Sequence, residues 1–217
     1  MAPGDFALVP AKGAWAGKSR LAARLSAQAR HALNLSQLHA TLAAVSAVFG
    51  PHGCLVVSPC AEILAAAAQS GVDGLRERGA AGLNGALEQG REALRRRGAR
   101  MLTIVPVDLP YLDAAELAGV LGGGDAADSV IVPDRALDGT NLLRIPAGLA
   151  FPFGYGPGSF GRHVDALLHS GIAPRVHCDT PLSIDLDRPG QLAGLARNRP
   201  HASRPAAVPV PDNTVHS

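Results

Sequence analysis

The stretch 7–20 has the sequence ALVPAKGAWAGKSR, and the rest of the chain is organised around it. Its apolar start belongs to a buried strand that we expect over residues 5–10, and an Ala/Leu-rich helical segment follows the loop. The loop carries three cations, Lys12, Lys18 and Arg20. Because backbone N–H groups and the positive end of a helix dipole also favour anions, this arrangement suits a polyphosphate.

The loop is similar to a P-loop, but its spacing differs. A P-loop requires Gly-x-x-x-x-Gly-Lys-Ser/Thr, whereas residues 13–19 are GAWAGKS, with one spacer residue too few. Lys12 stands where the first glycine should be. Since a phosphate nest depends on backbone geometry, the missing residue argues against a P-loop kinase. Phosphate binding by the three cations as charges, or a surface loop with solvated lysines, remain as interpretations.

Length and composition restrict the class of protein. The 217 residues are enough for one domain with a sizeable core, and a net charge of +2 argues against a dedicated nucleic-acid binder. The three cysteines lack Cys-x-x-Cys spacing, which indicates reduced thiols rather than a zinc site. Because we find neither a signal peptide nor an apolar run of about 18 residues, we expect a cytoplasmic protein that does not span a membrane.

Apolar runs alternate with helical patterns, and the runs are continuously apolar. Such runs predict strands buried on both faces, so the sequence indicates an α/β fold with a mainly parallel sheet covered by helices on either side. We expect strands at 5–10, 53–58, 100–107, 129–133, 138–143, 175–178 and 182–186, with a short one starting at 71. We expect helices at 19–49, 61–69, 82–97, from 113 onward, at 162–171 and at 189–197. The first helix would break at 34–36, with Ser36 capping its second piece. The domain would span 1–197, and the Pro-rich segment 198–217 would be a flexible tail.

Polar side chains occur where several of the predicted strands end, and these are Lys12, Ser58, Asp108 and Asp134. Parallel strands bring such positions to one edge of a sheet, where ligands of open α/β sheets bind. Asp108 also precedes Leu-Pro, and a carboxylate at a strand end can hold a hard cation such as magnesium. Taken alone, it could equally be a turn or cap residue.

A second acidic segment contains Asp185 and Asp187, two residues apart. This spacing would place both carboxylates on one face of the strand expected there, and a bound cation would relieve their repulsion. The bland alternative makes Asp187 a helix-start residue ahead of Pro189. Together with Asp108 and the basic loop, these carboxylates supply the parts for magnesium-assisted phosphoryl or nucleotidyl transfer.

Residues 154–163 form a glycine-rich segment, GYGPGSFGRH, that leads into a helix. Its backbone N–H groups, Ser159 and Arg162 could receive a second anion, and Thr140 would supply another donor. The alternative is a long irregular loop without a ligand. Two anion sites would indicate two phosphorylated substrates.

Several motifs together resemble one known family. They are the strand-Pro-Ala-Lys…Gly-Lys-Ser-Arg start, GLNGAL at 82–87, VDLP at 107–110, DGTNLL at 138–143, the segment 153–163 and IDLDRP at 184–189. Over roughly residues 5–197 the chain resembles the 2-phospho-L-lactate guanylyltransferase family, the CofC/FbiD enzymes of deazaflavin coenzyme biosynthesis. The resemblance implies a single-domain, three-layer Rossmann-like fold of the GT-A, nucleotide-diphospho-sugar-transferase type.

The resemblance also implies an activity and a set of site residues. GMP would be transferred from GTP to a phosphorylated three-carbon acid (2-phospho-L-lactate, phosphoenolpyruvate or 3-phosphoglycerate) with release of pyrophosphate. Asp108 and Asp187 would hold magnesium. The acid or nearby phosphates would be contacted by Lys12, Thr140, Gly156 and Ser159, and the nucleoside would face Pro10, Ser58 and Asn84. Members of this family often pair as homodimers, so the resemblance also raises a homodimer for this chain.

Two departures leave the identity of the acid open. Asp138 occupies a position where many relatives have glycine, and DRPGQ at 187–191 replaces the more common Asp-Thr-Pro-Glu-Asp. The expected chemistry needs no general base, because the attacking phosphate oxygen is already largely ionised near pH 7. The sequence leaves two alternative functions open: a nucleotidyltransferase of the same fold with another phosphorylated acceptor, and a non-catalytic GTP-binding module.

Overall fold

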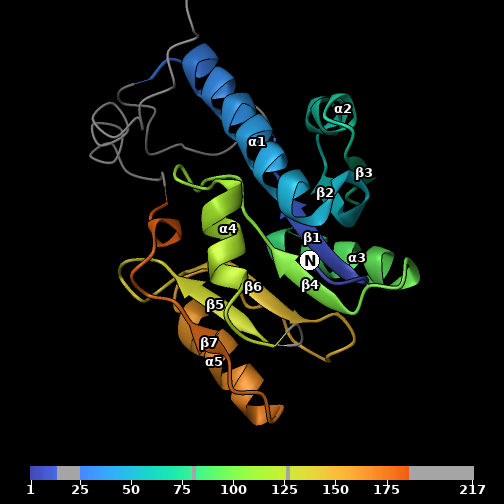
Figure 1. Ribbon diagram of the computed structural model, residues 1–217. Coiled ribbons are helices and arrows are strands. Elements are labelled where there is room, and N and C mark those ends of the chain that lie inside the picture. The colour runs from blue at the N-terminus through green and yellow to red at the C-terminus, as the bar shows by residue number, and fades with distance from the viewer. Residues whose placement is uncertain (14–24, 80–81, 126–127, 186–217) are drawn as a thin grey trace, which may run out of the picture.

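A single seven-stranded sheet forms the centre of the computed structural model, which describes residues 1–13, 25–79, 82–125 and 128–185 (Figure 1). The strand order is β3-β2-β1-β4-β6-β5-β7. The strands are β1 (Asp5–Pro10), β2 (Cys54–Ser58), β3 (Asp73–Arg76), β4 (Met101–Ile104), β5 (Val130–Pro133), β6 (Thr140–Pro146) and β7 (Arg175–Val176). The predicted α/β class is confirmed.

All strand pairs in this sheet are parallel except the two that include β6, which is antiparallel to both β4 and β5. The carboxyl ends of β1, β2, β4 and β5 therefore lie at one edge of the sheet, together with the start of β6. We call this edge the carboxyl rim. Because β6 runs backwards, its first residue, Thr140, comes to the same rim as Lys12 and Asp108.

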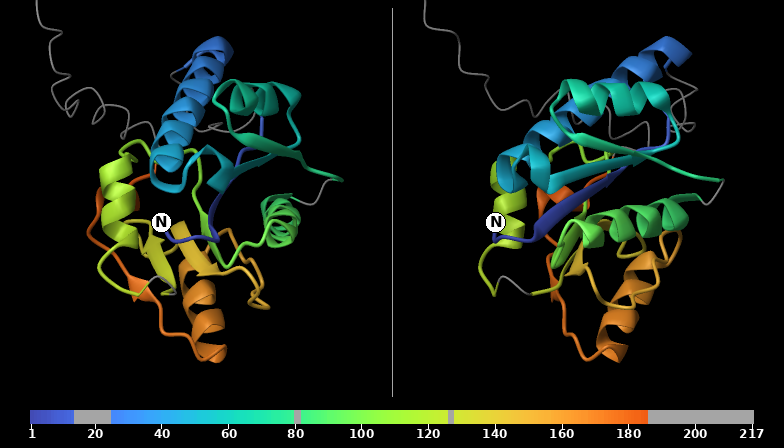
Figure 2. Two further views of the ribbon diagram at one scale, coloured as in Figure 1. Left: turned by 45° about the vertical axis from the view of Figure 1, so that its right-hand side comes forward. Right: turned by 90° about the vertical axis from the view of Figure 1, so that its right-hand side faces the viewer.

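Helices cover both faces of the sheet, which makes three layers (Figure 2). One face carries α1 (Ala27–Phe49), α2 (Ala61–Gln69) and α4 (Ala114–Leu121), and the other carries α3 (Gly82–Arg96) and α5 (Ser159–His169). Side chains alternate between the faces as the pleat requires: Ala7 and Val9 of β1 join the first core, and Leu8 joins the second. Burial on both faces explains why the strands are continuously apolar.

Helix α1 differs from the prediction. It runs through residues 34–36 without a break, and its N-cap is Ser26, whose hydroxyl accepts the Ala29 N–H, so the predicted cap at Ser36 is wrong. The helix is long and apolar enough to cross a membrane by length and composition alone, although the sequence shows no uninterrupted apolar run. Leu38, Leu42 and other residues of one face belong to the core, and α1 packs against α2 and α4. These contacts are those of a helix in the outer layer of this domain.

The segment before residue 186 also differs from the prediction. Pro181–Ser183 forms a 3-10 helix (η3), and this turn occupies the start of the strand predicted at 182–186. No strand is present over residues 182–185. The Thr180 hydroxyl caps it by accepting the Leu182 N–H. Asp185 therefore does not lie on the strand that was expected to place it on one face with Asp187. Asp187, the expected helix 189–197 and the tail 198–217 lie outside the described residues.

Candidate active site

A cavity of about 420 Å³ opens at the carboxyl rim, where the ends of β1 and β2 meet the start of α3. It is lined by Pro10, Ala11, Lys12, Gly13, Val57, Pro59, Glu77, Gly82, Leu83 and Ala86. Pro10 and Lys12, both predicted site residues, are among them. This volume is in the range of small-molecule sites, and its position agrees with the rule that ligands bind beyond the carboxyl ends of parallel strands.

The backbone at Lys12 is fixed by Ser58. The Ser58 hydroxyl donates to the Lys12 carbonyl oxygen at 2.8 Å and accepts the Cys60 N–H at 3.1 Å. Ser58 is fully buried, whereas the Lys12 side chain is exposed. The hydroxyl of Ser58 therefore supports the cavity wall from behind. The other two predicted cations, Lys18 and Arg20, lie outside the described residues.

Two predicted metal ligands are described, Asp108 in a turn after β4 and Asp185 after η3. Both are half-buried. The Asn141 amide of β6 donates to the Leu182 carbonyl at 2.9 Å, which attaches η3 to the rim three residues before Asp185. In the described ranges, no three His, Cys, Asp or Glu side chains gather into a metal cage. Magnesium is commonly bound without such a cage, by one or two carboxylates together with substrate phosphates and water, and carboxylates are what Asp108 and Asp185 offer.

The buried histidine of α5, His163, connects the start of β6 to the glycine-rich segment. His163 is fully buried; its Nδ1 lies 3.0 Å from the Thr140 hydroxyl, and its Nε2 accepts the Gly154 N–H at 3.1 Å. Burial, and secondarily the charge of Arg162, lower the pKa of His163 from 6.5 to about 4. The imidazole is therefore neutral at pH 7. The sequence places His163 next to Arg162 but does not reveal what it contacts.

The glycine-rich segment approaches the start of β6 and then enters α5, which begins at Ser159, three residues earlier than predicted. Gly156 and Gly158 have φ of 126° and 71°, a region that favours glycine. The Ser159 N–H donates to the Gly156 carbonyl, and the exposed Asp138 carboxylate accepts the Gly158 N–H at 2.9 Å. An N–H group at the start of α5 is thus already hydrogen-bonded to a carboxylate of this chain. We call residues 153–158 the glycine loop.

The glycine loop is also attached to α3 and α5. Arg162, which is exposed, donates from Nε and Nη2 to the Gly154 carbonyl at 3.2 and 2.8 Å. Asn84 in the first turn of α3 accepts the Tyr155 N–H at 2.9 Å and donates to the Tyr155 carbonyl at 3.4 Å. Two residues predicted to touch ligands therefore hold the loop itself.

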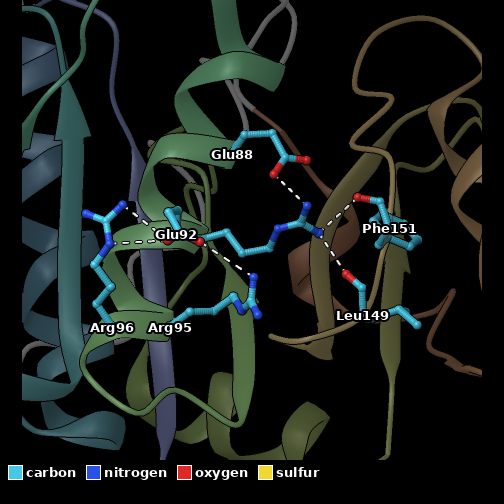
Figure 3. A network of polar contacts seen from close by, with 7 residues as sticks. Glu88, Glu92, Arg95, Arg96, Leu149 and Phe151 are labelled. Atoms are coloured by element: carbon cyan, nitrogen blue, oxygen red, sulfur yellow. Dashed lines mark hydrogen bonds and ion pairs between the residues drawn. The ribbon is translucent and has the colours of Figure 1, made fainter.

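Sequence reasoning missed Arg91 of α3. Its guanidinium donates to the carbonyls of Leu149 and Phe151 at 3.0 Å, pairs with Glu88 and lies 5.1 Å from the centre of the Phe153 ring. Figure 3 shows Glu88, Leu149 and Phe151 around this group, while Glu92 faces Arg95 and Arg96 on the exposed side of the helix. No motif marks Arg91, because the carbonyl groups that it binds are 58 and 60 residues away.

Thr140, Ser159 and Arg162 thus lie at the start of β6 and α5, and Gly156 lies in the glycine loop before α5. Pro10 and Lys12 are brought together at the cavity. Helix α3 connects the two groups, since Gly82 and Leu83 line the cavity while Asn84 holds the loop. The site therefore has two neighbouring regions, the cavity and the glycine loop with the start of α5.

Known proteins share this sequence and fold. The chain is 42% identical over 192 residues to the phosphoenolpyruvate guanylyltransferase of Rubrobacter xylanophilus (88% of this chain, 92% of the relative). It is 32% identical over 192 residues to the 2-phospho-L-lactate guanylyltransferase of Methanothermobacter thermautotrophicus (87% and 82%). A candidate nucleotide-diphospho-sugar transferase from Desulfovibrio desulfuricans has the same fold, with a TM-score of 0.67 at 13% identity (85% and 83%). The family described as "Guanylyl transferase CofC like" matches residues 6–197, and the chain belongs to this family of guanylyltransferases.

Proposed function

We propose that the protein transfers GMP from GTP to a phosphorylated three-carbon acid and releases pyrophosphate, as a cytoplasmic step of deazaflavin coenzyme biosynthesis. The observation that carries the proposal is the pair of neighbouring regions joined by α3, a cavity beside Lys12 and the glycine loop beside Thr140. Two regions suit two anionic substrates. Phosphoenolpyruvate is the first acid to test, because the relative at 42% identity is named for it.

The reaction requires a phosphate oxygen of the acid to attack the α-phosphorus of GTP. A new P–O bond forms there, the bond between the α-phosphorus and the bridging oxygen to the β-phosphate breaks, and pyrophosphate leaves with the electron pair. The attacking oxygen is largely ionised near pH 7, since the second pKa of a phosphate ester is about 6, so no general base is needed. This agrees with the environment of His163, whose two ring nitrogens are both engaged.

The main barrier is repulsion between two anions, so the residues proposed to act are those that place positive charge or N–H groups. Lys12, Lys18 and Arg20 would face the triphosphate, and Thr140, Gly156, Ser159 and Arg162 would bind the acid. Pro10 would contact the nucleoside directly, while Ser58 and Asn84 would support that site. Asp108, Asp185 and Asp187 would hold magnesium, which would neutralise the phosphates and the leaving group.

The test is incubation of the full chain with GTP, magnesium and each candidate acid, followed by pyrophosphate release and the mass of the product. We expect Asp108→Ala to lower turnover by at least about a hundredfold while circular dichroism stays unchanged, in line with loss of electrostatic stabilisation. The exposed Asp165 of α5 offers a matched control, Asp165→Ala, with near-normal turnover. Turnover retained by Asp108→Ala would contradict the metal assignment, and no pyrophosphate with any acid would contradict the function.

The proposed domain covers residues 1–197, with 198–217 as an appended tail. A chain ending at residue 197 should therefore keep the turnover of the full chain. A homodimer is proposed as its state in solution, and light scattering after gel filtration measures it. A monomeric mass would contradict the dimer without affecting the activity.

A further inference from the structure

We propose that His163 is a positioning residue that turns the Thr140 hydroxyl into a hydrogen-bond donor aimed at the acid substrate. The proton positions follow from the structure alone, whereas the acceptor of the Thr140 hydrogen bond rests on the function proposed above. Separate experiments test the proton positions and the acceptor.

The proton positions follow from the Gly154 contact. A backbone N–H group can only donate, so His163 Nε2, 3.1 Å away, must be an acceptor without a proton. A neutral imidazole carries one proton, which must then be on Nδ1. Nδ1–H therefore donates to the Thr140 hydroxyl oxygen at 3.0 Å. The less common tautomer of histidine is fixed by one backbone amide.

The surroundings of His163 keep it neutral. Its side chain is fully buried, and the rings of Phe151 and Tyr155 pack against it with centroid distances of 5.4 and 4.8 Å. The charged group beside it, Arg162, is a cation, and burial with this charge lowers the pKa of His163 to about 4. A second proton would also place an Nε2–H group against the Gly154 N–H. The tautomer is thus stable throughout the neutral range.

The consequence falls on Thr140. Because its oxygen accepts the Nδ1–H proton, its own O–H is left to donate, and no acceptor for it occurs in the part of the chain that the structure describes. Thr140 is the first residue of β6, 7% exposed, at the carboxyl rim beside the glycine loop. A carboxylate or phosphate oxygen of the acid is an acceptor only and would receive this proton.

The tautomer can be measured without any substrate. Imidazole ¹⁵N and ¹H correlation spectra of the ¹⁵N-labelled full chain at pH 7 should show His163 with its proton on Nδ1, assigned by comparison with His163→Asn. A spectrum with the proton on Nε2, or with both nitrogens protonated, would overturn the inference. This result does not depend on whether the protein is a guanylyltransferase.

Two matched variants test the role toward the substrate. The amide nitrogen of His163→Asn lies near the position of Nδ1 and keeps a donor for Thr140, whereas the amide of His163→Gln reaches the position of Nε2 and keeps only a partner for Gly154. Both lose one buried hydrogen bond, so a purely structural role would affect them alike. We expect His163→Gln to raise the KM of the acid about tenfold with the KM of GTP unchanged, and His163→Asn to stay near the wild type.

Coupling to Thr140 completes the test. In a Thr140→Val chain, which has no hydroxyl, His163→Gln should add no further increase in the KM of the acid. Equal effects of Asn and Gln, or additive effects of the two changes, would contradict the positioning role. If the wild type forms no product, the proposed function fails. A titration with phosphoenolpyruvate, followed by the His163 resonances, then tests whether the acid accepts the Thr140 proton. An unmoved Nδ1 signal at saturation would reject this acceptor.

Discussion

The side-chain amide of Asn84 pairs with the backbone of Tyr155: Oδ1 accepts the N–H at 2.9 Å, and Nδ2 donates to the carbonyl at 3.4 Å. These residues are 71 positions apart in the sequence. The pair joins the first turn of α3, next to the cavity, to the glycine loop. Asn84 therefore connects the proposed nucleotide region to the proposed acid region without needing to touch either ligand.

Replacement of Asn84 by alanine should therefore loosen the glycine loop. We expect Asn84→Ala, which loses both hydrogen bonds, to raise the KM of the acid about tenfold (about 1.4 kcal/mol), with a smaller rise for GTP. Gln89→Ala is the control, because the Gln89 amide pairs in the same way with the backbone of Arg78 and not with the loop. An increase confined to the KM of GTP would instead favour direct contact between Asn84 and the nucleotide.

The carboxylate of Asp138 should weaken binding of the acid. It is exposed and accepts the Gly158 N–H at the start of α5, where an anionic substrate would compete with it. Asp138→Asn keeps an acceptor for that N–H group but removes the charge, so we expect the KM of the acid to fall severalfold and its salt dependence to weaken. Initial rates at low and high ionic strength measure both effects, with Asp165→Asn as the control. A higher KM in Asp138→Asn would mean that the carboxylate assists binding.

Local patterns predicted the parts of the site that follow strand ends. The positions of Lys12 and Asp108 at the carboxyl rim could be predicted because continuous apolar runs indicate buried parallel strands. Thr140 also lies at this rim, but the sequence does not reveal the reason, which is that β6 is antiparallel to its neighbours. The residues that hold the glycine loop could not be assigned in the same way. The roles of Asn84, Arg91 and His163 depend on where a long loop returns, which no short window of sequence contains.

Two incorrect predictions of secondary structure had local causes. The predicted break at 34–36 relied on the cap preference of Ser36, but the packing of Leu38 and Leu42 on the sheet continues the helix through it. The predicted strand at 182–186 relied on its apolar residues, while Pro181 and the Thr180 cap favour a 3-10 turn. In both places residues just outside the segment used for the prediction determined the local structure.

A buried ion pair on the α1 side of the sheet should matter for stability and not for specificity. Arg144 of β6 is 1% exposed; its Nη2 lies 3.2 Å from both oxygens of Asp5 in β1, and its Nη1 donates to the Thr103 hydroxyl in β4. We expect Arg144→Met to reduce the free energy of unfolding by about 3–5 kcal/mol, because it leaves a buried carboxylate unpaired. Urea unfolding measures the change.

Removal of both charges provides the control for that pair. Arg144→Met with Asp5→Leu should be less destabilised than Arg144→Met alone, since no buried charge remains without a partner. The KM values of the single variant at a temperature where it is folded should match the wild type. A double variant that is less stable than the single one would show that the pair itself, and not the unpaired carboxylate, dominates the cost.

The lowered pKa of His163 should make the fold sensitive to mild acid. In the unfolded chain the imidazole titrates near 6.5, and in the fold near 4, so between these values the unfolded state binds more protons. Stability from this group is fully present above pH 6.5 and is lost as the pH falls toward 4, by about 3 kcal/mol in total. Urea unfolding of the wild type and of His163→Gln at several pH values isolates this contribution, because all other groups are shared. The difference between the two curves should decline from pH 7 to pH 4, and a difference independent of pH would show that His163 titrates alike in the folded and unfolded chains.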